Sequence, residues 1–358
     1  MKKPFVYHLC LLAFLILAAL GIYLSGRRVR LPYADQMQEA AALHRRALQA
    51  VKEERLRRGC AMVPEDTLQI GLLGEQISPI TTSLGSLEAK RTAQLPDFAA
   101  LCVRLFHEAG LQKGDRVGAC FSGSFPGLNL AVLCAAEVMD LEIHYSCSIG
   151  SSNYGANLPA YVLPEMIQTA VQAGCLSTMP ELVSLGGSGD AGQNMQGYVM
   201  EEPEEIDAML LRLAEEGIRL SAYPDYEENI RVHQSLLGPV KAFVNVGGNI
   251  LGLGNEDVSL GYGQGLLKPA SPRITETSGL VERYLAAGVP TIHLLNIKQL
   301  CAETGIPFDP LSLPEEGSSG VYYSRDYSRP LIALVFAGTA AALIWISLAE
   351  AREKGRRE

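Results

Sequence analysis

Two long apolar stretches, one near each end of the chain, restrict its organisation more than any other feature. The first runs from Phe5 to Leu24 and the second from Leu331 to Ala349, and neither contains Asp, Glu, Lys or Arg. Each has about the 20 residues that an α-helix needs to cross the hydrocarbon core of a bilayer. The sequence therefore predicts a two-pass protein of the cell membrane, with a long soluble region between the spans.

Positive charge near the spans indicates on which side of the membrane the soluble region lies. The C-terminal tail is basic, with Arg352, Lys354, Arg356 and Arg357, and this favours a cytoplasmic C-terminus. Two spans then put the N-terminus inside as well, so we predict an extracytoplasmic domain, although the Arg-rich segment 27–30 favours the opposite orientation. A cleavable signal peptide is the alternative for the first span, but its apolar run is long and arginines stand where small residues mark cleavage.

The soluble region is acidic and its cysteines are dispersed. Residues 1–30 and 330–358 hold nine of the 30 basic and three of the 39 acidic residues, so the region between them carries 21 basic against 36 acidic residues. Such a surface repels phosphates and excludes nucleic acid as a partner. The cysteines lack metal-site or disulfide-framework spacing, which indicates small buried hydrophobic residues and counts against an oxidising location. We predict no metal and no cofactor.

Hydrophobic periodicity predicts that helices and strands alternate between the spans. The segment Tyr33–Arg58 has no Gly or Pro and is typical of a juxtamembrane helix. A strand over 116–121, an almost wholly apolar helix over 125–139 and a strand over 141–147 form a βαβ unit. Further helices are predicted over 96–109, 160–173, 203–216, 227–237 and 279–287, and further strands over 218–222, 241–246 and 290–295.

This pattern predicts an α/β fold, a Rossmann-like three-layer domain with a mainly parallel sheet, flanked by two transmembrane helices. A Pro/Ser/Gly-rich stretch after the last strand is typical of a linker that returns the chain to the membrane. The expected organisation is an N-terminal anchor (1–30), a juxtamembrane helix (31–60), the α/β domain (61–306), a linker (307–329) and a C-terminal transmembrane helix with its basic tail (330–358).

Open α/β sheets bind ligands at the carboxyl ends of their strands, and three polar loops lie at such points. Ser122 and Ser124 follow the strand 116–121 and precede a helix, so their hydroxyls and the first N–H groups of that helix suit an anion or a carboxylate. Asp190 ends a second, Gly-rich loop, and Asn249 follows a later strand. The alternative is that the serines cap the helix and that the glycine loops are plain connectors.

A basic pair lies upstream of these loops, among the Ser and Thr residues of the segment 81–92. Lys90 and Arg91 are suited to hold a carboxylate by charge-assisted hydrogen bonds, and Arg91 is suited to do so by a bidentate fork. The alternative for this pair is a solvated loop or the start of a helix. The predicted ligand-binding residues are Lys90, Arg91, Ser122, Ser124, Asp190 and Asn249.

Most signatures of catalysis are missing from the sequence. It has no P-loop, no G-x-G-x-x-G after a strand and no H-E-x-x-H, and the segment Gly123–Gly127 fails the nucleophile-elbow pattern because Phe occupies its centre. The histidines at 107, 144, 233 and 293 are isolated, and we interpret them as structural. A Ser–His pair that joins Ser122 or Ser124 to His144 or His293 stays open, and the catalytic residues stay undefined.

Several segments resemble the poly-γ-glutamate system protein family. The similarity covers Ile77–Val132, which includes SPITTSLGSLEAKRT and FSGSFPGLN, and extends to Ser184–Gly192 (SLGGSGDAG) and Val244–Asn249 (VNVGGN). Members of that family begin with a membrane anchor and are associated with bacterial genes for making and exporting poly-γ-glutamate. The resemblance implies a role in capsule synthesis, export or release, but no activity, and without a P-loop the chain is not expected to be the ATP-dependent synthetase.

The leading hypothesis is thus a membrane-anchored accessory component of poly-γ-glutamate biosynthesis or export. Its expected partners are the polymer or a glutamate-like carboxylate ligand, other membrane components of the system, and the lipid bilayer. The alternative is a hydrolase or transferase acting on γ-glutamyl or other amide bonds, with Ser122 or Ser124 as nucleophile and Asp190 or a strand histidine as its partner. A structural scaffold whose loops bind nothing is the third hypothesis.

Overall fold

The chain divides into two compact units, Met1–Leu31 with Tyr323–Glu358, and Pro32–Tyr322. Three residues that carry sequence predictions, Ala222, Arg356 and Arg357, lie outside the described residues. The computed structural model describes residues 3–221, 223, 225–255 and 258–354.

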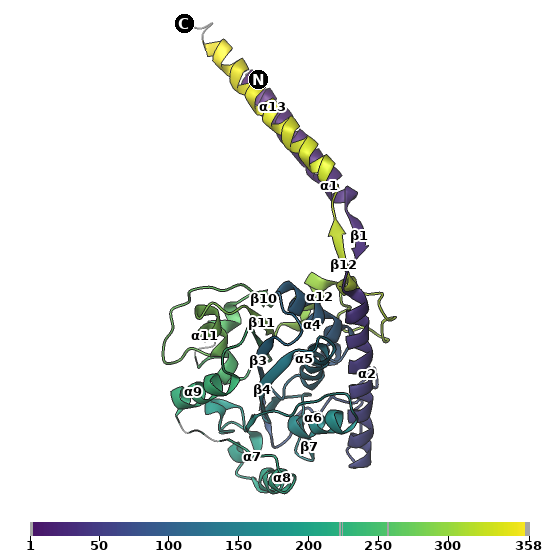
Figure 1. The fold of residues 1–358 in the computed structure, drawn as a ribbon, viewed down its shortest axis with the longest axis vertical. Helices are drawn as coiled ribbons and strands as arrows, with labels where there is room; N and C mark the ends of the chain where they lie inside the picture. The colour runs from purple at the N-terminus through teal and green to yellow at the C-terminus, as the bar shows by residue number, and fades with distance from the viewer. Residues whose placement is uncertain (1–2, 222, 224, 256–257, 355–358) are drawn as a thin grey trace. The chain divides into compact units, whose positions relative to one another are not determined.

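The first unit is a hairpin made of the two chain ends. Helix α1 (Lys3–Ser25) lies beside α13 (Arg329–Lys354), as Figure 1 shows. Strands β1 (Arg27–Arg30) and β12 (Tyr323–Asp326) continue the hairpin as a two-stranded antiparallel ribbon. Both helices are long and apolar enough to cross a membrane, which agrees with the two predicted spans in length and composition.

The second unit is built on a six-stranded, largely parallel sheet with the order β10-β11-β9-β3-β4-β8. The edge strand β10 runs antiparallel to β11, and the other neighbours are parallel. Strands β3 and β9 are buried almost throughout, as expected for a parallel sheet covered on both faces. The strands are β3 (Arg116–Phe121), β4 (Glu142–Ser148), β8 (Leu182–Ser184), β9 (Ala242–Val246), β10 (Gly265–Leu267) and β11 (Thr291–Leu294).

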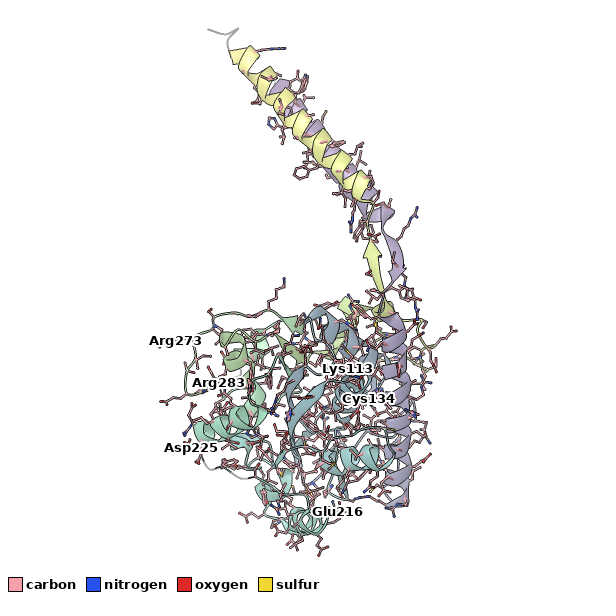
Figure 2. All side chains as sticks on the ribbon, viewed as in Figure 1. Lys113, Cys134, Glu216, Asp225, Arg273 and Arg283 are labelled. Atoms are coloured by element: carbon pink, nitrogen blue, oxygen red, sulfur yellow. The ribbon has the colours of Figure 1, made fainter. Side chains whose placement is uncertain are left out.

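Helices cover both faces of the sheet (Figure 1). Helices α9 and α11 lie on one face, where Arg283 of α11, labelled in Figure 2, forms an ion pair with Glu227 of α9 (2.7 Å). Helices α4, α5 and α6 lie on the other, and α2 packs across all three of them. Helix α5 is apolar all round because it is enclosed between α2, α4 and the sheet. The helices are α2 (Ala34–Arg57), α4 (Asp97–Glu108), α5 (Pro126–Val138), α6 (Leu163–Gln172), α8 (Glu204–Glu215), α9 (Tyr226–Leu237) and α11 (Leu280–Ala286).

The order of the strands reverses beside β3. The chain passes from β3 outward to β4 and β8, then returns to the other side of β3 with β9. From there it goes to the edge strand β10 and comes back to β11, which lies between β10 and β9. The loops that leave β3 and β9 therefore diverge from neighbouring strands, and this opens a crevice at their carboxyl ends.

Short elements complete the unit around that crevice. Strand β2 pairs in parallel with β5, and β6 pairs with β7 in a tight antiparallel turn. They are β2 (Thr81–Ser83), α3 (Leu87–Thr92), β5 (Ser151–Ser152), β6 (Asn157–Leu158), β7 (Tyr161–Val162), η1 (Ser188–Asp190), α7 (Gln196–Val199), α10 (Ile250–Leu253), η2 (Val258–Gly261), α12 (Ile297–Thr304) and η3 (Gly320–Tyr322).

The prediction of a mixed α/β fold with a mainly parallel sheet is confirmed, and most predicted elements lie within a few residues of their expected bounds. The prediction of a strand over 218–222 is wrong for its described part, because Leu220 makes only an isolated parallel bridge with Val183. Strands β8 and β10 were not predicted, since three residues are too few to show an alternation. All eight cysteines are free, and those at 102, 120, 134, 147, 175 and 301 are buried.

Candidate functional site

A polar cleft lies at the carboxyl ends of the parallel strands, where the strand order reverses. Two adjoining cavities of about 410 and 210 Å³ share Ser83, Ser124 and Gly248 in their walls. The larger one extends to α12 and the smaller one to the loop after β8. We call the two together the polar cleft. Hydroxyl and amide side chains dominate its remaining walls, among them Thr82, Ser86, Ser122, Ser148, Ser152, Ser188, Asn194, Asn249, Asn255 and Asn296.

Helix α3 brings Lys90 to this cleft. Ser86 is the N-cap of α3 and accepts a hydrogen bond from the backbone N–H of Ala89 (3.2 Å), which fixes where the helix begins. Lys90 follows one turn later, and the pairing of β2 with β5 places Ser152 opposite it. The Lys90 Nζ donates hydrogen bonds to Ser152 Oγ (2.6 Å) and to the carbonyl oxygen of Ser124.

The surroundings of Lys90 are unusual for a lysine. Its side chain is only 3% exposed, and Nζ lies 3.9 Å from the centroid of the Phe125 ring. Among the described residues, no ion pair or hydrogen bond joins Lys90 to a carboxylate. Burial removes the hydration of the charged form and lowers the pKa of Lys90 to about 7. Near neutral pH this amine is therefore able to donate a proton, accept one, or hold an anion.

The loop after β3 folds as a tight turn along the floor of the cleft. The Ser122 Oγ accepts a hydrogen bond from the N–H of Ser124 (3.2 Å), and the Ser124 Oγ accepts one from the N–H of Ser152 (3.0 Å). The N-cap position of α5 is Phe125, which has no side-chain cap, so neither serine caps that helix. Gly123 permits the close approach of the loop after β4, because a Cβ there would lie 2.6 Å from the carbonyl oxygen of Ile149.

Asn249 joins the ends of β3 and β9. Its Nδ2 donates to the carbonyl oxygen of Phe121 (3.3 Å), and its Oδ1 accepts from the N–H of Gly252 as the N-cap of α10. Gly247 turns the chain with a φ of +80°, and a Cβ there would lie 2.9 Å from the Cβ of Ser122. Asn249 lines the cleft, but its amide is already engaged in holding two loops together.

Asp190 is buried behind the Gly-rich loop and does not line the polar cleft. Its carboxylate accepts hydrogen bonds from Ser184 Oγ (2.7 Å) and Asn229 Nδ2 (2.9 Å). Burial raises the pKa of Asp190 to about 6, against the hydrogen bonds, which lower it. The residues of this loop that reach the cleft are Gly187 and Ser188.

Arg91 lies outside the lining of the cleft, although it neighbours Lys90 in the sequence. Its Nε and Nη2 form a bidentate pair with the two carboxylate oxygens of Asp309 (2.7 and 2.8 Å). Asp309 belongs to the segment that the sequence predicted to be a linker, so this fork holds that segment against α3. The bidentate geometry expected of Arg91 is present, and its partner is a carboxylate of the chain itself.

The histidines have partners other than the serines of the cleft. The Nδ1 of His293 lies 3.2 Å from Asn245 Nδ2, and His144 pairs with Glu181. Burial lowers the pKa of His293 to about 4, so its ring is neutral at physiological pH. Within the part of the chain that the structure describes, no hydrogen bond joins Ser122 or Ser124 to a histidine or to Asp190.

The charge of the polar cleft is opposite to that of the molecule. The chain carries a net charge of −9, yet none of the described residues that line the cleft carries a carboxylate. Lys90 and Lys298 line its larger cavity. Two lysines among hydroxyls and amides, in a cleft partly screened from water, favour an anionic ligand.

Sequence reasoning missed Ser152 and Lys298, which both line the larger cavity. The pair Ser151–Ser152 lies in a loop with no apolar periodicity, and its strand pairing with β2 is made with residues far away in the sequence. The signal that marks Lys298 is its place just after the strand 290–295, at another carboxyl end of the sheet.

Comparisons with protein-family models, with curated proteins and with solved structures found no match to this chain.

Proposed function

We propose that the chain is a membrane-anchored accessory component of poly-γ-glutamate biosynthesis or export, and that its polar cleft binds the polymer or a glutamate-like carboxylate. The α1–α13 hairpin is the proposed two-pass anchor, and the α/β unit is the extracytoplasmic part. We classify that unit as Rossmann-like because its strand order reverses beside its first parallel strand.

One observation carries this proposal. The three segments that resemble the poly-γ-glutamate system protein family are far apart in the sequence, and each contributes to the wall of the same cleft. They do so through Lys90, Ser124, Ser188 and Asn249. Because the described lining residues are free of carboxylates while the chain as a whole is acidic, the cleft suits a ligand that the rest of the surface repels.

A binding experiment tests the ligand directly. The full-length protein in detergent micelles is titrated with oligo-γ-glutamate in a calorimeter, as wild type and as Lys298→Ala. Loss of one charge-assisted contact of about 1.5 kcal/mol predicts roughly tenfold weaker binding. Lys113→Ala is the matched control, since Lys113 is an exposed lysine in the loop before β3. That loop lies at the amino ends of the strands, away from the cleft. Undetectable binding by the wild type, or equal affinities for wild type and Lys298→Ala, contradicts the proposal.

A cellular experiment tests the role. Deletion of the gene in its bacterium is expected to change the amount or the chain length of surface poly-γ-glutamate. Restoring the wild-type gene reverses this change, and restoring a version without residues 329–354 does not. An unchanged polymer after deletion rejects the role, whatever the cleft binds.

The sidedness of the α/β unit is tested by reporter fusions. An enzyme that is active only outside the cytoplasm is fused near Gly317 or after Glu358, and activity is expected for the first fusion alone. The reverse pattern places the α/β unit in the cytoplasm and rejects the extracytoplasmic assignment.

A further inference from the structure

The contact between Lys90 and Ser152 has the geometry of a nucleophile with its base. The two side chains come from different elements, α3 and β5, and their Nζ and Oγ atoms are 2.6 Å apart. Both are buried, with 3% and 5% exposure, yet both line the larger cavity of the polar cleft. A buried amine in contact with a hydroxyl that faces a ligand cavity is the arrangement of Ser–Lys acyl-transfer sites.

We propose that Ser152 is a nucleophile and Lys90 its general base, and that this pair cleaves or transfers acyl groups at amide bonds between carboxylate-bearing residues. The choice of γ-glutamyl bonds as substrate rests on the proposed function. The assignment of the pair itself rests on the geometry of the two side chains.

The surroundings of Lys90 supply the neutral amine that a general base requires. Its Nζ is enclosed by the Phe125 ring, the carbonyl oxygen of Ser124 and Ser152 Oγ. Burial alone lowers the pKa of Lys90 to about 7, so a large share of the molecules holds a neutral amine at neutral pH.

Other charged groups near α3 are engaged elsewhere or lie across the cavity. On α3 itself, Glu88 accepts a hydrogen bond from Ser86 Oγ (2.6 Å) and Arg91 forms its fork with Asp309. From α12, Lys298 lines the same cavity, but it is a cation and therefore no counter-ion for Lys90. These groups leave Lys90 without a counter-ion among the described residues.

The reaction balances with water or an amine as the second substrate. The Ser152 Oγ attacks the amide carbonyl carbon while its proton passes to Lys90 Nζ, and the carbonyl oxygen becomes an oxyanion. When the tetrahedral intermediate collapses, the C–N bond breaks and the protonated Lys90 gives its proton to the leaving nitrogen. Water or an amine then attacks the Ser152 ester and gives a proton to Lys90, and collapse returns that proton to Ser152 Oγ, which releases an acid or a new amide.

The shape of the cleft fits an extended substrate. The two cavities meet at Ser83, Ser124 and Gly248, and they reach from α12 on one side to the loop after β8 on the other. Ser152 lies beside this junction, because its backbone N–H donates to Ser124 Oγ. A chain that passes through both cavities therefore places an interior bond, rather than a free end, next to Ser152.

A small activated ester tests the pair without any assumption about the natural ligand. Full-length protein in detergent is mixed with p-nitrophenyl acetate, nitrophenolate release is followed, and the acetylated residue is located by mass spectrometry. We expect one acetyl group on Ser152 and a rate that rises with pH to a plateau, with its midpoint near 7. Loss of the general base is expected to slow acetylation by about 100-fold or more.

Variants distinguish the loss of the Ser152–Lys90 pair from a loss of folding. Ser152→Ala is expected to abolish acetylation at this site, and Lys90→Met and Lys90→Arg are each expected to slow it, the second while keeping a positive charge. Ser146→Ala is the matched control, since Ser146 is a buried serine on β4 that does not line the polar cleft. Circular dichroism is used to check that each variant is folded. Acetylation of Lys90 instead of Ser152, or a Lys90→Arg rate within threefold of the wild type, overturns the proposal.

Oligo-γ-glutamate separates the failure of this inference from the failure of the proposed function. Binding is measured by calorimetry on Ser152→Ala, and cleavage or transfer is measured by mass spectrometry on the wild type with and without an added amine. Binding with no change of the oligomer, and no acetylation by the ester, leaves the proposed function standing and rejects the Ser152–Lys90 pair. Acetylation of Ser152 without binding or cleavage of the oligomer supports the pair and rejects γ-glutamyl chains as its substrate.

Discussion

The two sides of helix α3 differ in how they surround a positively charged side chain. On one side Arg91, 16% exposed at its side chain, has both carboxylate oxygens of Asp309 as partners. On the other side the next residue back, Lys90, is buried against hydroxyls, a carbonyl oxygen and an aromatic ring. The first arrangement compensates the charge, whereas the second leaves the protonated amine without a counter-ion among the described residues.

This difference indicates which of the two residues serves the fold. A forked Arg–carboxylate pair contributes to stability, while a buried ammonium without a counter-ion reduces it. Residues that reduce stability are typical of functional sites, where a strained or desolvated group is retained for its chemistry. The sequence Lys-Arg suggests a single basic cluster, but the structure separates it into a structural residue and a candidate functional one.

The largest expected effect is that of Lys90→Met on the free energy of unfolding, which changes sign with pH. The pKa of Lys90 is about 7 in the folded chain and about 10.4 in an unfolded one. Below pH 7 both states are protonated and the full cost of burying the charge is present; between pH 7 and about 10.4 the unfolded chain binds more protons, so stability rises with pH. Raising the pH from 6 to 10.5 therefore removes about 4 kcal/mol of the cost of burying the charge in the wild type. In Lys90→Met that cost is absent at both pH values, but the loss of the amine's hydrogen bonds reduces stability by about 2 kcal/mol.

We therefore expect Lys90→Met to be about 2 kcal/mol more stable than the wild type at pH 6 and about 2 kcal/mol less stable at pH 10.5. Urea unfolding of the full-length protein in detergent, followed by tyrosine fluorescence at both pH values, checks this. Lys113→Met is the control, because Lys113 is exposed and pairs with Asp140 at the surface. A difference that does not depend on pH would show that the Lys90 amine is not desolvated.

Arg91→Ala is expected to have the second largest effect on the free energy of unfolding, and this effect does not change sign with pH. It removes the fork to Asp309, so the free energy of unfolding is expected to fall by about 2 kcal/mol at neutral pH. The Arg91 guanidinium lowers the pKa of Asp309, so the contribution is present above the unfolded pKa of about 4 and is lost as pH falls below it.

The same variant also tests the separation of the two sides of α3. Affinity for oligo-γ-glutamate and acetylation of Ser152 are expected to stay within threefold of the wild type, because Arg91 does not line the cleft. A double-mutant cycle with Asp309→Ala isolates the fork from other effects. If Arg91→Ala weakens binding as much as Lys298→Ala does, Arg91 belongs to the ligand site and this prediction is wrong.

The smallest effect is expected for Ser124→Ala. Its Oγ accepts one hydrogen bond from the N–H of Ser152, and the loss of that acceptor is expected to reduce the free energy of unfolding by about 1 kcal/mol. Acetylation of Ser152 should slow by less than tenfold, since the contact of Lys90 with the Ser124 carbonyl oxygen remains. A loss of rate equal to that of Ser152→Ala would make Ser124 the nucleophile instead.

The fold was predictable from the sequence where patterns are local. The apolar helix α5 and its flanking strands follow one another within a short segment, and β3 has the predicted bounds, 116–121. The loops after β3 and β9 were also predictable as cleft walls, because a parallel sheet brings the carboxyl ends of its strands to one edge. Ser122, Ser124 and Asn249 accordingly line the cleft.

The site was not predictable where it depends on distant partners. Arg91 and Lys90 are equivalent as a sequence pattern, and only Asp309, which lies 218 residues further on, distinguishes them. Ser152 faces Lys90 because β5, a two-residue strand without periodicity, pairs with β2. Asp190 does not reach the cleft because its carboxylate accepts hydrogen bonds from Ser184 and from Asn229 of α9. No local sequence pattern indicates these two contacts.

The ribbon of β1 and β12 also sets an order of events during synthesis. Arg30 is the register partner of Tyr323, so the whole α/β unit lies in the loop that this pairing closes. Residues 27–30 leave the ribosome early, and their backbone groups have no strand to pair with until almost the entire chain has been made. Closure of so long a loop is slow but only modestly more costly than closure of a shorter one. The ribbon is therefore among the last contacts to form, and a chain truncated before β12 carries its first apolar helix with an unpaired strand beside it.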